Sequence, residues 1–74
     1  MESVFIKTDY ITLGQFLKFT GSITNGSEAK TAVLVLKISI NGVSETRRGR
    51  KIYPGDVVKI EKKSYVIVLS NENK

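Results

Sequence analysis

The sequence contains no cysteine, no histidine and no tryptophan, and it has a single proline among its 74 residues. Without cysteine, the chain has no disulfides, thiolate nucleophiles or zinc–thiolate sites, and without histidine it lacks the usual general base and the usual metal ligand. Neither a nucleophile–base pair nor a metal cluster of the common kinds can be assembled from what remains. We therefore predict a protein that is not an enzyme, with no cofactor, no metal and no small-molecule substrate.

Long apolar runs are also absent, because no stretch approaches the roughly 20 residues that cross a bilayer. Residues 1–7 combine neither a basic start with an apolar run nor a small-residue cleavage site, so they do not resemble a signal peptide. The hydrophobic share of 41% is enough for one small core, and the net charge of +5 suits a soluble monomer. We expect a single domain over residues 1–74, in the cytoplasm, with no membrane partner.

The positive charge is concentrated in one part of the chain. Residues 1–36 carry three basic and three acidic side chains, and residues 64–74 carry one of each, so residues 37–63 hold the whole excess, eight basic against three acidic. Its densest stretch, here called the basic segment, is Arg47, Arg48, Gly49, Arg50 and Lys51. Arginine is suited to bidentate phosphate binding, and clustered charge produces a local positive field. This pattern predicts a surface that binds a polyanion.

A first helix is predicted over residues 13–19. Thr12 and Gln15 have the spacing of a capping box, in which each side chain bonds the backbone of the other residue. Leu13, Phe16 and Leu17 then form one apolar stripe at helical spacing, and Lys18 points away from it.

A second helix is predicted to begin after Asn25 or Ser27 and to end near Leu36, although residues 32–40 have the β-branched content of a strand as well. Residues 38–40 are predicted to be a strand, followed by a tight turn at Asn41-Gly42 and a return from Val43. Residues 4–6 are predicted to be an edge strand.

Residues 53–56 read Tyr-Pro-Gly-Asp and predict a second turn, in which Asp56 bonds the turn backbone. Strands are predicted at residues 57–60 and 65–69, joined across residues 61–64. Tyr53 and Tyr65 could stack on exposed bases, but both are expected in the core. The fold class is therefore α+β, with two short helices packed on a small, twisted antiparallel sheet.

This order of features resembles the S4-type RNA-binding domain, whose helix–helix–hairpin core is called the αL motif. The resemblance covers residues 11–60 and rests on four stretches: Leu13 to Leu17, Ser27-Glu28-Ala29-Lys30, Ile38 to Gly42, and Gly55 to Val58. Residues 12–18 and 47–53 are most similar to the small standalone bacterial proteins of the YaaA type. A tail at residues 70–74 is expected to be flexible.

The resemblance implies binding of folded RNA, with ribosomal RNA as the expected target, and a role in ribosome assembly or translation. It implies that the RNA-binding residues are Ser27, Lys30, Arg47, Arg48, Arg50 and Lys51. Three positions depart from the family: Gly26 replaces a common arginine, Gly14 replaces an acidic residue, and Leu36 replaces the glycine at the helix exit.

Phosphate and shape recognition is the expected mechanism, since we predict no aromatic platform for unpaired bases. The main alternative is a protein-interaction module that docks an acidic protein partner on the same cations. A membrane-surface role is a weaker alternative, because the basic residues are not on an amphipathic helix.

Overall fold

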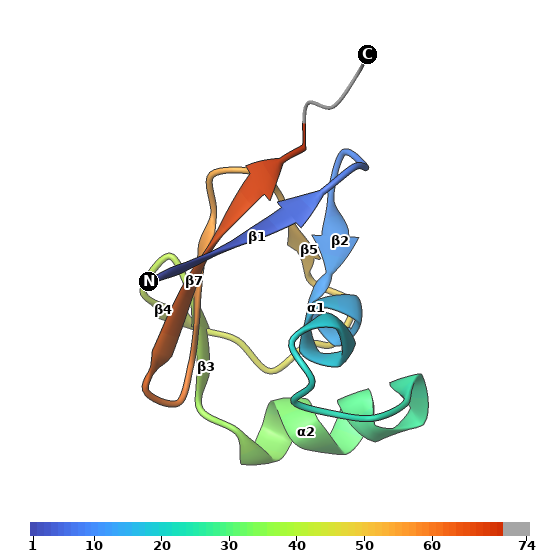
Figure 1. Ribbon diagram of the computed structural model, residues 1–74. Helices are drawn as coiled ribbons and strands as arrows, with labels where there is room; N and C mark the ends of the chain where they lie inside the picture. The colour runs from blue at the N-terminus through green and yellow to red at the C-terminus, as the bar shows by residue number, and fades with distance from the viewer. Residues whose placement is uncertain (71–74) are drawn as a thin grey trace.

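The computed structural model describes residues 1–70, in which a twisted sheet lies on one side and a short strand pair with two helices lies on the other (Figure 1). The strands are β1 (Glu2–Ile6), β2 (Ile11–Thr12), β3 (Ile38–Ile40), β4 (Val43–Ser44), β5 (Lys51–Ile52), β6 (Val57–Ile60) and β7 (Lys63–Leu69). The helices are α1 (Leu13–Phe19), the short 3₁₀ helix η1 (Gly26–Glu28) and α2 (Ala29–Val35). The predicted α+β class is confirmed.

The larger sheet has the strand order β1-β7-β6-β3-β4, and β2 pairs with β5 in a separate two-stranded sheet. The larger sheet is mixed, because β1 runs parallel to β7 with Glu2 opposite Tyr65 and Ile6 opposite Leu69. The expectation of a wholly antiparallel sheet was wrong at this one pair. The edge position of β1 is as predicted, and the backbone N–H of Ser70 extends the contact by donating to the carbonyl of Ile6 at 2.7 Å. The rest of the predicted tail, residues 71–74, lies outside the described residues.

Helix α1 begins and ends where the sequence predicts. The Thr12 side chain accepts from the backbone N–H of Gln15 at 3.2 Å, and the Gln15 side chain accepts from the N–H of Thr12 at 2.9 Å. The reciprocal bonds satisfy two amides at a helix end where intrahelical partners are missing.

Helix α2 ends at Val35, one residue before the predicted position. Leu36 has an extended backbone, with φ −82° and ψ 148°, so the chain leaves the helix without the left-handed conformation that favours glycine. Leucine at this family glycine position is therefore accommodated without strain. At the other end, the Asn25 side chain caps η1 by accepting from the N–H of Ser27 at 3.0 Å.

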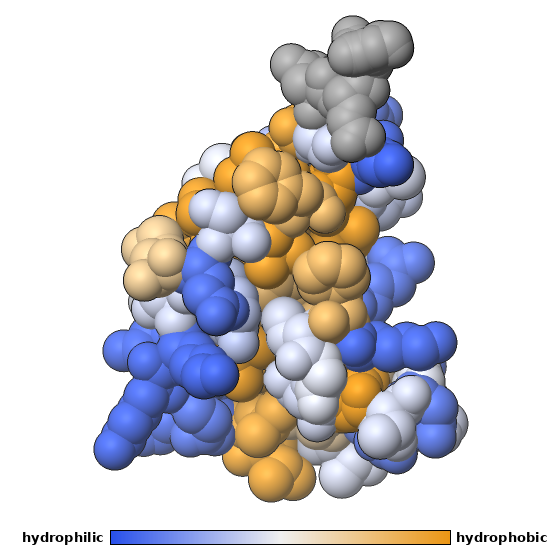
Figure 2. Space-filling view, in the orientation of Figure 1, coloured by the Kyte–Doolittle hydropathy of each residue, from blue (hydrophilic) through white to orange (hydrophobic). Residues whose placement is uncertain are grey.

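The core lies between the helices and the larger sheet. Its largest fully buried side chains are Phe16, Leu13, Leu17, Ile40, Ile52, Ile67 and Val58. The Phe16 ring meets the Tyr65 ring edge-on at a centroid distance of 5.3 Å, which confirms Tyr65 as a core residue. Tyr53 was expected there too, but 48% of it is exposed. On the face seen in Figure 2, apolar side chains form a central band and hydrophilic ones gather on both flanks.

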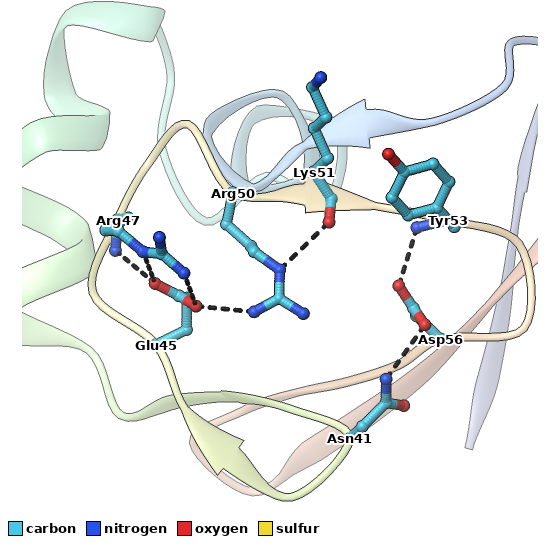
Figure 3. Close-up of polar contacts among 7 residues, drawn as sticks. All are labelled: Asn41, Glu45, Arg47, Arg50, Lys51, Tyr53 and Asp56. Atoms are coloured by element: carbon cyan, nitrogen blue, oxygen red, sulfur yellow. Dashed lines mark hydrogen bonds and ion pairs between the residues drawn. The ribbon is translucent and has the colours of Figure 1, made fainter.

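Both predicted turns are present, and side chains tie them together. Asn41 has φ 53°, its amide donates to Asp56 at 3.0 Å, and its side-chain oxygen accepts from the N–H of Val57 at 2.9 Å. Asp56 also accepts from the N–H of Tyr53 at 2.8 Å, so its predicted role in the turn backbone is confirmed (Figure 3). The last hairpin is tighter than predicted, because β7 already begins at Lys63 and only Glu61 and Lys62 lie between the paired ends.

Candidate nucleic-acid interface

The basic segment is attached to the start of α1. The N–H of Leu13 donates to the carbonyl of Arg50 at 2.8 Å, and the N–H of Gly14 donates to the carbonyl of Arg48 at 2.9 Å. The first amides of a helix have no intrahelical acceptors, so these bonds satisfy two donors and fix the backbone of the segment at once. The β2–β5 pairing, with Thr12 opposite Lys51, continues the same attachment.

Gly14 makes this close approach possible. A Cβ atom at this position would lie 3.3 Å from the Cβ of Ala29 and 3.4 Å from the carbonyl oxygen of Arg48. Those distances are tight for a carbon atom, and any longer side chain would press on α2 and the basic segment together. The glycine that departs from the family pattern therefore has a packing role at the contact of three elements.

Glu45 organises two of the four cations, and sequence reasoning missed it. It is buried, with 7% of its surface exposed. Its carboxylate accepts from the Arg47 Nε at 2.8 Å, from the Arg47 backbone N–H at 3.0 Å and from an Arg50 terminal nitrogen at 2.8 Å (Figure 3). Its position two residues before Arg47 was visible in the sequence, but burial of the carboxylate was not.

These contacts change the ionisation of the cluster. The hydrogen bond from the Arg47 side chain, supported by the backbone N–H of Arg47 and by Arg50, lowers the pKa of Glu45 from 4.5 to about 2 against the opposing effect of burial. The same hydrogen bond with Glu45 raises the pKa of Arg47. The cluster of Glu45, Arg47 and Arg50 therefore carries one net positive charge at neutral pH instead of two, and its guanidinium groups are held in fixed directions.

The other two cations of the segment are oriented differently. Arg48 is exposed, and none of residues 1–70 pairs with its side chain. Lys51 extends from the side of β5 opposite the Arg50 guanidinium (Figure 3), and its Nζ lies 4.9 Å from the centre of the Tyr10 ring. Lys51 belongs to a strand and not, as expected, to a loop.

A shallow hollow lies on the surface where the basic segment meets the helices. It is lined by Thr12, Gly14, Gln15, Lys18, Gly26, Ala29, Arg48 and Gly49. Lys18 and Arg48 thus border one concave surface from two different elements. Lys18 was not among the predicted site residues. Its position three residues after Gln15 and six after Thr12, on the helix face away from the core, was the available signal.

The two predicted helix-side residues are placed unequally. Lys30 is exposed on α2, directly after Ala29, which lines the hollow. Ser27 donates its hydroxyl to Asn25 and borders a different hollow, with Ile23, Thr31 and Leu36 among its walls. Lys30 thus lies on the helix that borders the Lys18–Arg48 hollow but is not one of the lining residues, while the Ser27 hydroxyl donates to the Asn25 side chain that caps η1.

Comparison with known proteins agrees with this architecture. The model of the S4 domain family matches residues 4–68. The chain belongs to the S4 domain family. As an S4 domain, it is also 47% identical over 58 residues to a protein of Bacillus subtilis (strain 168) named "Probable ribosome maturation protein RlbA", an alignment that covers 78% of this chain and 82% of that protein.

Residues 1–70 contain no group of three or more histidine, cysteine, aspartate or glutamate side chains arranged to hold a metal ion. None of the helices within that range is long and apolar enough to cross a membrane. The cationic surface around the basic segment is the feature that calls for a partner.

Proposed function

We propose that this S4 domain is a nonenzymatic protein that binds folded RNA, with ribosomal RNA as its target and ribosome assembly or translation as its setting. The observation that carries the proposal is the attachment of the basic segment to α1 through the Leu13–Arg50 and Gly14–Arg48 backbone bonds. A cation on an anchored backbone loses little conformational freedom when it meets a phosphate, so less free energy is spent on ordering it.

The proposed contacts fall into two groups. Arg48 and Lys18 are exposed and supply direct phosphate contacts at the hollow, and Lys30 supplies another from the exposed surface of α2. Arg47 and Arg50 keep donor groups beyond those used by Glu45, since each guanidinium has five N–H donors. Glu45 aims these two side chains before RNA arrives, which favours a defined backbone geometry over diffuse attraction.

The remaining predicted residues have lesser parts in the proposal. Lys51 lies at the far end of the segment and extends the cationic surface along β5. Ser27 contributes by holding the start of η1 through its Asn25 contact, and the RNA meets it at the margin of the site. Gly26 leaves open space where many relatives place an arginine, so the backbone of a nucleic acid can approach the hollow closely.

The named relative supports the proposed target class. A protein named for ribosome maturation shares nearly half of its aligned residues with this chain, which supports ribosomal RNA as the ligand. The proposal includes a cytoplasmic location and a monomeric protein, because a ribosomal target is found there and one domain presents a complete cationic surface.

The test is a titration of purified ribosomal RNA with wild type and with Lys18→Gln/Arg48→Gln across a salt series. Contact with four or five phosphates predicts a slope of log K against log salt of roughly −3 to −4.5, and loss of two contacts makes it shallower by roughly 1.4 to 1.8. The control is Lys62→Gln/Lys63→Gln, which removes two exposed charges that do not line the Lys18–Arg48 hollow. Circular dichroism checks that both variants remain folded.

Weaker binding and a shallower slope for Lys18→Gln/Arg48→Gln alone would support the site. Equal losses in both variants would mean that the whole positive field, and not this hollow, attracts RNA. No binding by wild type would reject the RNA proposal. In that case a partner captured after RNase treatment would favour the acidic-protein alternative.

A further inference from the structure

Two of the three tyrosines lie outside the core, next to the basic segment. Tyr10 is 38% exposed and Tyr53 is 48% exposed, whereas Tyr65 is only 6% exposed. The Tyr10 and Tyr53 ring centres are 5.6 Å apart, with the planes tilted by 48°. Large aromatic side chains gain free energy from burial, so an exposed pair beside a cationic surface is a sign of a ligand.

The backbone explains why the rings meet. In the β2–β5 pair, Ile11 lies opposite Ile52 and Thr12 opposite Lys51. Continuing that antiparallel register by one step puts Tyr10 opposite Tyr53. Side chains alternate along a strand, so Lys51 and Tyr53 extend to one side while Ile52, fully buried, enters the core between them. Figure 3 shows Lys51 and Tyr53 on the same side of β5, away from Glu45.

The cation completes the arrangement. The Lys51 Nζ lies 4.9 Å from the centre of the Tyr10 ring, within the range of a cation–π contact. The ammonium group is therefore held against the Tyr10 ring, whose other neighbour is Tyr53. A phosphate attracted by Lys51 would bring its own base within reach of the tyrosines, since base and phosphate belong to one nucleotide.

We propose that Tyr10, Tyr53 and Lys51 form a stacking site for an unpaired RNA base beside the phosphate-binding surface. Tyr53 supplies the open aromatic surface, Tyr10 supports it from the neighbouring strand, and Lys51 binds the phosphate of the stacked nucleotide. The inference rests on the proposed function and adds a preference for RNA with unpaired bases. It replaces the expectation that this chain lacks an aromatic platform.

The tyrosines themselves provide the signal for the test. The chain has three tyrosines and no tryptophan. In Tyr65→Phe, which keeps the core ring, all tyrosine fluorescence comes from Tyr10 and Tyr53. This protein is titrated with a single-stranded oligoadenylate and with a blunt, fully paired RNA duplex of equal nucleotide content. We expect quenching by the single strand and little by the duplex.

The matched variants are Tyr53→Leu, which loses the ring, and Tyr53→Phe, which keeps it, both made in the wild-type chain and measured by fluorescence anisotropy of labelled RNA. Stacking of one base predicts that Tyr53→Leu binds the single strand about 5- to 100-fold more weakly, with duplex binding unchanged. Tyr53→Phe should bind like wild type. Circular dichroism confirms that each variant is folded.

The outcomes separate the two proposals. If wild type binds both RNAs and Tyr53→Leu binds the single strand as well as Tyr53→Phe does, the stacking site is rejected and RNA binding stands. If Tyr53→Leu weakens both RNAs to the same extent, stacking of unpaired bases is likewise rejected. If wild type binds neither the single strand nor the duplex, the stacking site is rejected, and the ribosomal RNA titration decides the proposed function separately.

Discussion

Replacing the buried carboxylate with Glu45→Gln should remove a pH-dependent part of the stability of this protein. Gln has nearly the same shape but no charge, so the side chain still fills its site while the two charge-assisted contacts with Arg47 and Arg50 are lost. These contacts are short, at 2.8 Å each. The change therefore tests the charge and leaves the packing nearly as it was.

The magnitude follows from the pKa of Glu45. A fall from 4.5 to about 2 corresponds to about 3 kcal/mol at most, because one pKa unit equals about 1.36 kcal/mol. The Arg47 side chain is 74% exposed, so water screens its part of the interaction. We therefore expect Glu45→Gln to lower the free energy of unfolding by about 1–2 kcal/mol at pH 7.

The direction of the pH dependence is fixed by the lowered pKa. The stabilisation is fully present above the unfolded value of 4.5 and is lost as the pH falls towards about 2, where the folded carboxylate takes up its proton. Urea unfolding followed by circular dichroism, at several pH values from 7 down to 2, measures this directly. The difference between wild type and Glu45→Gln should shrink across that range and vanish near pH 2.

The control for this experiment is Glu2→Gln, which removes a carboxylate that is exposed in β1. Its stability should follow that of wild type at every pH. A constant difference between wild type and Glu45→Gln from pH 7 to pH 2 would refute the reasoning, since the carboxylate charge would then contribute nothing.

Two further changes test the mounting of the site. Gly14→Val should lower the free energy of unfolding by about 1–3 kcal/mol, because the valine side chain overpacks the contact with Ala29. It should also weaken RNA binding, because the same side chain pushes on the Arg48 backbone. Unchanged urea unfolding would contradict this packing role. Asn41→Ala should lower the free energy of unfolding by about 1–2 kcal/mol, because the Val57 amide loses its side-chain acceptor and alanine disfavours the positive φ at this position. Asn41→Gly tolerates that φ and should recover part of the lost stability.

The sequence by itself determined the local structure. The capping residues Thr12 and Gln15 fixed the start of α1, since both bonds of the box join residues three apart. The turns at Asn41-Gly42 and Tyr53 to Asp56 were equally local, because they depend on which residues tolerate positive φ. The fold class, the core position of Tyr65 and the cationic character of the basic segment followed from the same kind of pattern.

The tertiary structure alone decided what depends on contacts between distant residues. Strand direction is not encoded in alternation, so the parallel pairing of β1 with β7 appeared only in the folded chain. The end of the β6–β7 hairpin and the exposure of Tyr53 were predicted wrongly for the same reason. Both strand pairing and burial depend on which strand lies opposite. The β2–β5 pair is long-range in this sense, since Ile11 and Ile52 are 41 residues apart, and it brings Tyr10 to Tyr53.

The candidate site likewise depends partly on the sequence and partly on the tertiary structure. The sequence located four cations, but the free energy of a charge depends on its neighbours in space, and only the fold showed that Glu45 holds Arg47 and Arg50. The fold also brought Lys18 and Arg48 to one hollow from segments 30 residues apart. Residue type and spacing thus decided which chemistry this protein has, and tertiary packing decided which of its cations are available to a partner.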